Sequence, residues 1–431
     1  MTTEASLLRR LYGLLTLRWL GTGLIIPFFV LIMQERGLSL GEIGFALAFY
    51  GATVVILELP TGSFADSVGR RPTLLLAAAA MLAGEAVFLF AGDLAVFVVA
   101  WVLLGFGRAL DSGALNAWFV DAAIAIDPEV DLRQALSGAG AIGAGAVAVG
   151  ALLGGALPVL LSAAGLTGSA AGLMVPLVGS MVVTLAYAVA IAALVHEPPR
   201  HGEGSTLRDA LADIPAVLRS GGRTAVTNRA VRPLLLAMVV MGLAISSLET
   251  LWQPRFNELL DGYEGNTMWF GVLGAAAFFG AALGALAAPR LSKVFAGSGA
   301  RTASAAQAAV GVTIVALGVA GTVPLAAVLF TVTYVFVGVR GPLHEEMLHR
   351  QVSGGGRSTM LSLDSLALQI GGIAGAAFAG VLAGSRGIPV TWVVVGAVTV
   401  ASALLYLAAD TGADQAESAP QPDDVAARPR S

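Results

Sequence analysis

Twelve long apolar stretches dominate this sequence and restrict what it can fold into. Each one comes close to or exceeds the ~20 apolar residues that a helix needs to cross the hydrocarbon core of a bilayer. The stretches fall at about 11–33, 40–60, 73–91, 95–125, 134–160, 172–195, 232–256, 267–288, 301–321, 324–348, 358–383 and 388–408. In lipid, only helices or closed barrels satisfy every backbone polar group, and these stretches lack the alternation typical of strands. We therefore expect an all-α membrane protein with twelve transmembrane helices.

The composition excludes most other classes of protein. Only 12% of the residues are charged and 57% are hydrophobic, whereas soluble domains carry about 25% charged residues. The chain contains no cysteine, which removes disulfide frameworks, cysteine-ligated metals and thiol nucleophiles. The first apolar stretch is too long for the apolar core of a cleavable signal, so we interpret it as the first span. We expect a non-enzymatic, monomeric protein whose partner is the lipid bilayer and not nucleic acid.

The basic residues predict the orientation of the chain. If the N-terminus is cytoplasmic, 18 of the 24 basic residues face the cytoplasm and three lie within spans. Only Arg36, Arg255 and Arg386 then lie on the outer side. Because cytoplasmic loops are enriched in Lys and Arg, we expect both termini in the cytoplasm and the spans in the plasma membrane.

The longest loop divides the spans into two sets of six. We expect an N-terminal bundle over 1–195, a cytoplasmic linker over 196–231, a C-terminal bundle over 232–408 and a disordered tail over 409–431. Within the linker, Thr206–Leu218 can form an amphipathic helix on the membrane surface. The similar stretches Arg133–Ser137 and Arg357–Ser362 open the fifth and eleventh spans. Two related halves of this kind are a transporter plan, with the substrate site between them near the midplane.

A specific motif, Gly-Ser-Phe-Ala-Asp-Ser-Val-Gly-Arg-Arg-Pro, follows the second span at 62–72. It resembles the cytoplasmic loop signature of the major facilitator superfamily, G-x-x-x-D-x-x-G-R-[KR], in every fixed residue and in its position. The resemblance implies the major facilitator fold, in which this loop latches the two halves together. It also implies that the motif arginine pairs with an acid at the end of the fourth span. The gate residues implied in this way are Gly62, Asp66, Gly69, Arg70, Arg71 and Asp121.

Two further segments resemble particular branches of that superfamily. The run from Leu57 to Asp66 and the glycine-rich stretch Gly150–Gly155 look like motifs of proton-coupled drug exporters, with Ala151 where the second motif usually has proline. The segment Arg108–Gly113 resembles the fourth-span motif R-x-x-Q-G, with aspartate at position 111 in place of glutamine. Arg108 and Asp111 are three residues apart, so they share a helix face on which they can pair.

Charged residues inside spans are costly, so each one is a candidate functional group. Glu85 and Glu249 have no base beside them in the sequence, which suits a carboxylate that takes up and releases a proton; neutralising an arginine of the bundle is the alternative. Glu58, just before Pro60, fits a gate or a structural role better than a substrate ligand. The residues that we expect in proton coupling are Glu85, Arg108, Asp111, Glu249 and Asp364. Those expected around the substrate are Arg18, Asn116, Ser246, Trp252, Gln253 and Arg340.

Metal- and nucleotide-dependent functions find no support in the sequence. His344 and His349 are five residues apart, which turns them about 140° from each other on a helix, so they cannot share a metal as an i, i+4 pair does. The glycine-rich run 353–357 lacks the Lys-Ser/Thr of a phosphate-binding loop. We therefore expect no cofactor and no metal, and a proton gradient as the energy source. The expected function is export of a small amphipathic organic compound by proton antiport; uptake of a small solute by proton symport is the alternative.

Overall fold

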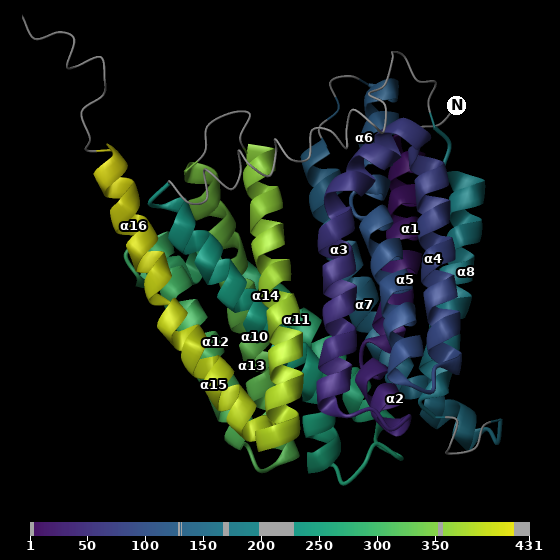
Figure 1. Cartoon of the computed structure of the whole chain (residues 1–431). Helices are drawn as coiled ribbons and strands as arrows, with labels where there is room; N and C mark the ends of the chain where they lie inside the picture. Colours follow the sequence, from purple (N-terminus) through teal and green to yellow (C-terminus); the bar gives the residue numbers. More distant parts are fainter. Residues whose placement is uncertain are drawn as a thin grey trace, which may run out of the picture.

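The computed structural model describes residues 4–127, 130, 132–166, 172–197, 228–351 and 357–417. Within these ranges the chain is helical apart from short turns (Figure 1). The first group of helices comprises α1 (Glu4–Ile25), α2 (Phe29–Glu35), α3 (Leu40–Val68), α4 (Arg70–Phe90), α5 (Leu94–Asp111), α6 (Ala114–Ile126), α7 (Leu132–Ala163) and α8 (Met174–Leu194). The second group comprises α10 (Val231–Leu259), α11 (Thr267–Val294), α12 (Gly299–Val319), α13 (Val323–Arg350), α14 (Arg357–Arg386), α15 (Ile388–Ser402) and α16 (Leu404–Glu417).

These helices provide 12 candidate membrane spans, as the apolar stretches predict. Three spans are broken into two helices each, which the sequence did not indicate. The first span turns between Ile25 and Phe29, and the last is interrupted at Ala403. The fourth is broken between Asp111 and Ala114, where Gly113 adopts a left-handed φ of 76°. Glycine allows that conformation at no steric cost. The apolar sequence is therefore continuous across Gly113, although the helix is broken there.

The ends of several helices differ from the expected boundaries. The second span was expected to end near residue 60, but α3 continues to Val68 and carries most of the signature motif within a helix. The expected tail begins at 409, whereas α16 extends to Glu417. Most of the expected linker, residues 198–227 with Thr206–Leu218, lies outside the described residues, as does the chain after 417.

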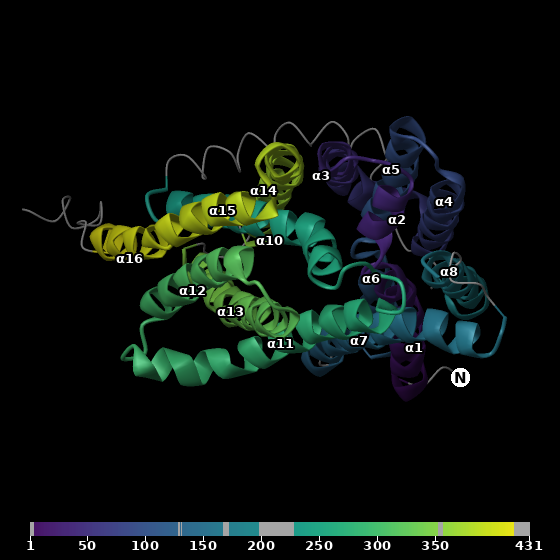
Figure 2. The same cartoon turned by 90° about the horizontal axis from the view of Figure 1, so that it is seen from below.

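The helices form two bundles that stand side by side (Figures 1 and 2). In one, α1 packs against α7 and α8, and α5 packs against α3 and α4; in the other, α10 packs against α14, and α13 against α11 and α12. Two pairs of helices make the most extensive contacts between the bundles, α3 with α14 and α7 with α11, and α2 also touches α10. Figure 2 shows these two pairs on opposite sides of the space between the bundles.

The two ends of the molecule differ in how the bundles meet. We call the end that holds the start of α1 and the end of α16 the terminal face, and the end that holds α2 the distal face (Figure 1). Towards the distal face, one hydrophobic core spans both bundles and includes Phe28, Ile43, Trp252 and Phe270. Towards the terminal face each bundle has a separate core: one runs from Leu7 to Val195 and the other from Val231 to Ala409. The bundles are thus sealed at the distal face and separate at the terminal face.

Glycines make the distal seal possible by letting the helix backbones touch. A Cβ atom on Gly155 of α7 would lie 2.8 Å from the carbonyl oxygen of Thr267 and 2.9 Å from Cα of Gly271 in α11. A Cβ atom on Gly44 of α3 would overlap the carbonyl oxygen of Ala376 in α14. Backbone atoms cannot move aside as flexible side chains do, so these seams depend on the absence of side chains.

Candidate functional site

A cavity lies between the bundles and has two adjoining parts. The larger, of about 390 Å³, is lined mostly by α1, α3, α4, α5 and α8. The smaller, of about 250 Å³, lies between α3 on one side and α10 and α14 on the other. Four residues line both parts: Phe29, Leu47, Tyr50 and Glu249. The position between the halves is the one that the sequence predicts for a substrate.

Aromatic rings form one wall of the larger part. Trp101 lies edge-on to Phe29, Tyr50 and Phe88, with ring centroids 5.3, 5.5 and 5.7 Å away. Trp101 is 9% exposed, and its indole nitrogen has no hydrogen-bond partner among the described residues. The wall therefore offers a large apolar and aromatic surface, which suits the apolar part of an amphipathic molecule.

Glu85 on α4 faces the larger part of the cavity. Its Oε1 accepts hydrogen bonds from the hydroxyls of Ser180 at 2.6 Å and Thr184 at 3.1 Å, both on α8. Its Oε2 is buried and has no partner among the described residues. Arg18 acts on this carboxylate only at longer range, without an ion pair. Glu85 is therefore a cavity carboxylate held by neutral groups, with one oxygen free for a proton or a ligand.

Glu249 on α10 is the acidic residue that lines both parts of the cavity. The hydroxyl of Tyr334 on α13 donates a hydrogen bond to it, and so does the side chain of Trp252 on α10. Ser246, three residues before Glu249 on α10, also lines the smaller part, where it was expected near the substrate. Within the described part of the chain, no basic side chain forms an ion pair with Glu249.

Trp252 and Gln253 were expected in the cavity, but the structure places both in the distal seal. Trp252 is 1% exposed and packs against Phe256, Phe270 and Phe330. Gln253 donates from Nε2 to the carbonyl oxygen of Ile26 at 2.9 Å, which links the two bundles. Both residues lie further along α10 than Glu249, where the bundles already touch.

The buried ion pair of the first bundle is not the one that the sequence suggested. The expected pairing of Arg108 with Asp111 is wrong, because Asp111 accepts from Nε of Arg18 at 2.7 Å and from the Tyr187 hydroxyl at 2.8 Å. Arg108 lines the cavity, with its guanidinium 5.8 Å from the centre of the Trp19 ring. Sequence spacing identified the helix face but could not show that α1 supplies the partner.

Two other expected site residues lie away from the cavity. Asn116 is exposed on α6, because the break at Gly113 turns α6 away from the face of α5 that carries Arg108. Arg340 is 4% exposed and lies inside the second bundle, where its Nη1 donates to the hydroxyl of Tyr406 at 2.8 Å. Neither residue lines either part of the cavity.

The signature motif lies at the terminal face, where α3 turns into α4. Gly69 occupies the turn with a φ of 124°, a conformation that favours glycine. Arg70 forms an ion pair with Asp121 of α6 at 3.5 Å. Arg71 instead holds the end of α8 and the chain beyond it: its Nη2 donates to the carbonyl of Ala192 and its backbone N–H to Glu197, both at 2.7 Å.

The remaining motif positions can be placed only by their backbone. Gly62 and Asp66 lie in the last turns of α3, and the Asp66 side chain lies outside what the structure describes. The gate role of all six motif and partner residues stays a prediction.

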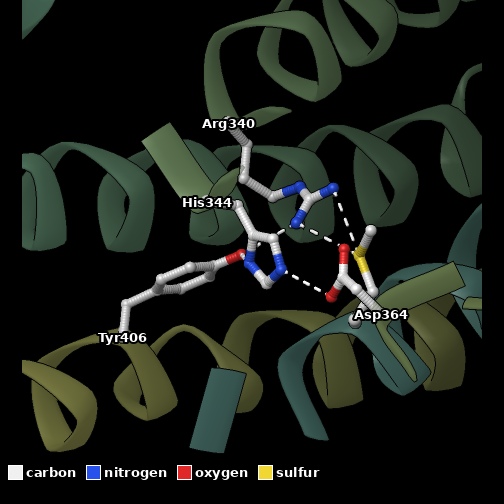
Figure 3. A network of polar contacts seen from close by, with 5 residues as sticks. Arg340, His344, Asp364 and Tyr406 are labelled. Atoms are coloured by element: carbon white, nitrogen blue, oxygen red, sulfur yellow. Dashed lines mark hydrogen bonds and ion pairs between the residues drawn. The ribbon is translucent and has the colours of Figure 1, made fainter. Parts of the chain in front are cut away.

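Asp364 belongs to a buried polar cluster that the sequence did not reveal (Figure 3). It accepts from Nε2 of His344 at 2.8 Å, and Nδ1 of His344 lies 2.9 Å from the hydroxyl of Tyr406. The one available signal was the i, i+4 spacing of Arg340 and His344, which puts both on one face of α13.

Four hydroxyl residues that hold the charged groups of the cavity region were also missed, because hydroxyl residues in apolar stretches carry no motif: Tyr187, Ser180, Thr184 and Tyr334.

Comparisons with known proteins agree with this architecture. Residues 11–341 match the family model described as Major Facilitator Superfamily. The chain therefore belongs to the major facilitator superfamily and is a multi-pass membrane transporter, not an enzyme.

A curated relative and several solved structures are similar to the chain. The inner membrane transport protein YajR of Escherichia coli K12 is 31% identical over 104 residues, which cover 24% of this chain and only 21% of that protein's length. The nucleoside transporter NupG matches with a TM-score of 0.73 at 12% identity, covering 94% of this chain and 98% of that one. A bacterial homologue of the human lysosomal transporter Spinster, in its inward-facing occupied form, matches with a TM-score of 0.70 at 15% identity, over 96% and 98% of the two chains. At these identities the solved structures indicate the fold alone.

Proposed function

We propose that this transporter exports a small amphipathic organic compound in exchange for protons, by alternating access. The observation that carries the proposal is a pair of carboxylates on one cavity, of which Glu85 is buried and Glu249 is half-buried. Glu85 and Glu249 both line it, and neutral side chains rather than arginine hold both: two hydroxyls for Glu85, and the Tyr334 hydroxyl and the Trp252 side chain for Glu249. A carboxylate without a cationic partner in a poorly solvated place gains most from binding a proton or a cationic group. The two ligands can therefore compete for one site, which is what antiport requires.

The cavity wall supports an amphipathic substrate. The rings around Trp101 provide a face for an apolar or aromatic group. Arg108 and Glu249 provide charges of opposite sign on the same cavity. We propose that a substrate lies with its apolar part against Trp101 and its polar part towards these charges.

The arrangement of the bundles supports the conformational half of the proposal. The terminal face is open and the distal face is sealed, so the cavity can load from the terminal side. We propose that the terminal face is cytoplasmic and that the membrane is the plasma membrane, in keeping with the excess of arginine on that side. Because the chain has no cysteine, single cysteines report the orientation directly. A cysteine at Gly92 should react with an impermeant maleimide in intact cells, and one at Val294 should not.

The signature loop fits a gate at the terminal face. In the open form described here, the ion pair between Arg70 and Asp121 lies within the first bundle. We propose that closure brings this loop against the second bundle, so that the motif residues stabilise the distal-open form. Arg18 and Asp111, paired beside the cavity, would hold the first bundle in register during the movement.

Everted membrane vesicles with an imposed proton gradient test the proposal. Adding a transported compound should release protons from an acidified lumen, detected with a pH-sensitive dye, in wild type and in the control Glu346→Gln, whose side chain is exposed. Glu85→Gln and Glu249→Gln should each abolish that release. Proton movement in the same direction as the compound would favour the alternative, symport. Wild-type proton release in both variants would remove these carboxylates from the mechanism.

A further inference from the structure

A compact polar cluster lies inside the second bundle, apart from the cavity (Figure 3). Arg340 and His344 come from α13, Asp364 from α14 and Tyr406 from α16; their exposed fractions are 4, 0, 6 and 0%. None of the four lines either part of the cavity. Burying a charged pair costs several kcal/mol per ion unless its hydrogen bonds are satisfied. A bundle that only needed to pack would be served better by apolar residues at these positions.

The hydrogen bonds of the cluster run in one direction. The arginine side chain has donors only, so Nη1 of Arg340 donates to the oxygen of Tyr406 at 2.8 Å. With His344 neutral and its ring proton on Nε2, that hydroxyl donates its own proton to Nδ1 of His344 at 2.9 Å. Nε2 of His344 carries the remaining ring proton and donates to Oδ1 of Asp364 at 2.8 Å. These bonds are all satisfied with a neutral histidine, between a positive arginine and a negative aspartate that balance each other.

A proton added to His344 would break this order. Nδ1 would become a donor, so the oxygen of Tyr406 would face two donors, and its own proton would lose its acceptor within the cluster. The cluster would also carry a net charge of about +1 in a buried place, which is costly. Protonation therefore disfavours this packing of α13, α14 and α16 and favours one that lets these helices separate.

Among the residues that the structure describes, no other charged group in reach compensates that charge from inside the bundle. Within the described residues, the ionisable groups that act on His344 are Asp364, Arg340 and Tyr406 from the cluster, with Glu345 as the one addition. Glu345 follows His344 on α13 and is itself exposed. The contact from α10 is the sulfur of Met238, 3.6 Å from Arg340.

The cluster is linked to the other bundle through α14. Ser365, the residue after Asp364, donates to Oε1 of Glu58 on α3 at 3.4 Å. Further along, Gly380 of α14 touches α3 at Gly44. One face of α14 is therefore fixed to its own bundle by Asp364 while the adjacent face contacts the other bundle. Because Asp364 and Ser365 are adjacent on α14, a displacement of Asp364 in the cluster also displaces the Ser365 contact between the two bundles.

We propose that His344, held by Asp364 and Tyr406, is a second proton-binding site of this transporter, outside the substrate cavity, and that a proton on it disfavours the form with the open terminal face. The place of this site in the cycle rests on the proposed proton-coupled function. Its effect on conformation needs no substrate and stands separately.

Spin labels on the full chain in lipid nanodiscs test this proposal. Ala125→Cys on α6 and Val294→Cys on α11 place one label on each bundle at the terminal face, at exposed positions. Glu85→Gln and Glu249→Gln in the same chain remove the cavity carboxylates from the pH response. Between about pH 8 and about pH 5, where histidine changes charge, the long-distance population should fall relative to the short one. We expect about a tenfold change, which corresponds to about 1.4 kcal/mol of differential proton binding.

Three substitutions in that chain decide the outcome. His344→Gln should abolish the pH response, and His349→Gln, just over one turn further along α13 and outside the cluster, should leave it unchanged. Tyr406→Phe keeps the ring but no longer occupies Nδ1, so the midpoint of the response should move to higher pH. A response that survives His344→Gln, or a midpoint unchanged in Tyr406→Phe, would overturn the proposal. Proton-driven export that survives in the Glu85→Gln/Glu249→Gln chain would instead contradict the proposed function and leave this readout intact.

Discussion

The seam between α7 and α11 offers the sharpest test of the conformational account. Gly155→Ala adds one methyl group where a Cβ atom would lie 2.8 Å from the carbonyl oxygen of Thr267 and 2.9 Å from Cα of Gly271. Both contacts are to backbone, so the helices themselves must separate. Overpacking of this kind costs about 1–3 kcal/mol. The cost falls on the distal-sealed form alone, because the two helices part when the distal face opens.

A shift of that size is directly measurable. A penalty of about 1–3 kcal/mol changes the ratio of two conformations by about 5- to 150-fold. Labels at Gly92→Cys and Gly321→Cys report the distal face of the two bundles, since both glycines lie in exposed turns with no atom near a would-be Cβ. Double electron–electron resonance should show a larger long-distance population in Gly155→Ala than in wild type.

The chain supplies a matched control on the same helix. Gly145 of α7 also lies in a helical position, but a Cβ atom there would meet nothing within 4 Å. Gly145→Ala changes helix propensity in the same way as Gly155→Ala, by about 1 kcal/mol, without touching α11. If the two alanine variants give the same distance distributions, the seam does not hold the distal face closed and the reasoning fails.

Three further predictions follow from single contacts. Asp111→Asn should lower the thermal unfolding midpoint in detergent, because it leaves the buried Arg18 without its carboxylate at a cost of about 3–5 kcal/mol. The double substitution Arg18→Met/Asp111→Leu should restore the unfolding midpoint but not transport. Arg70→Gln or Asp121→Asn should change stability by under about 1 kcal/mol, since the pair is partly exposed, yet slow the transport rate; an unchanged rate would remove the pair from the gate. Tyr263→Phe removes the hydrogen bond that the Tyr263 hydroxyl donates to Glu35 across the distal face at 2.8 Å, a bond worth about 1 kcal/mol. The distal-open population should therefore increase in the same spin-label measurement, and an unchanged population would exclude that bond from the seal.

The number of spans was predictable from the sequence because the bilayer imposes a local rule. An apolar stretch of sufficient length must be helical, wherever its neighbours lie. The break at Gly113 escaped the same rule, since glycine is common in membrane helices and only its φ of 76° distinguishes this one. Helix ends such as Val68 also lie beyond the apolar stretch, where hydropathy carries no information.

The site was predictable only as far as one helix could reveal it. Glu85, Glu249 and Ser246 were found because charge or helical spacing marks them within a single span. The partner of Asp111 was not, because Arg18 lies 93 residues away in the sequence. The cluster around His344 was missed for the same reason: Tyr406 is 62 residues away, and tyrosine in an apolar stretch carries no signal of its own. Pairings between helices depend on packing, which spacing along one chain cannot encode.

Transport by the purified protein in proteoliposomes tests the central claim of proton antiport most directly. With the compound on both sides and no gradient, exchange needs binding and movement but no net proton transfer. With an imposed pH gradient, accumulation needs binding and movement of the compound and also net proton transfer. We predict that Glu85→Gln and Glu249→Gln lose gradient-driven accumulation, and that at least one of them still exchanges compound. Gradient-driven accumulation at the wild-type level in both variants would contradict the account.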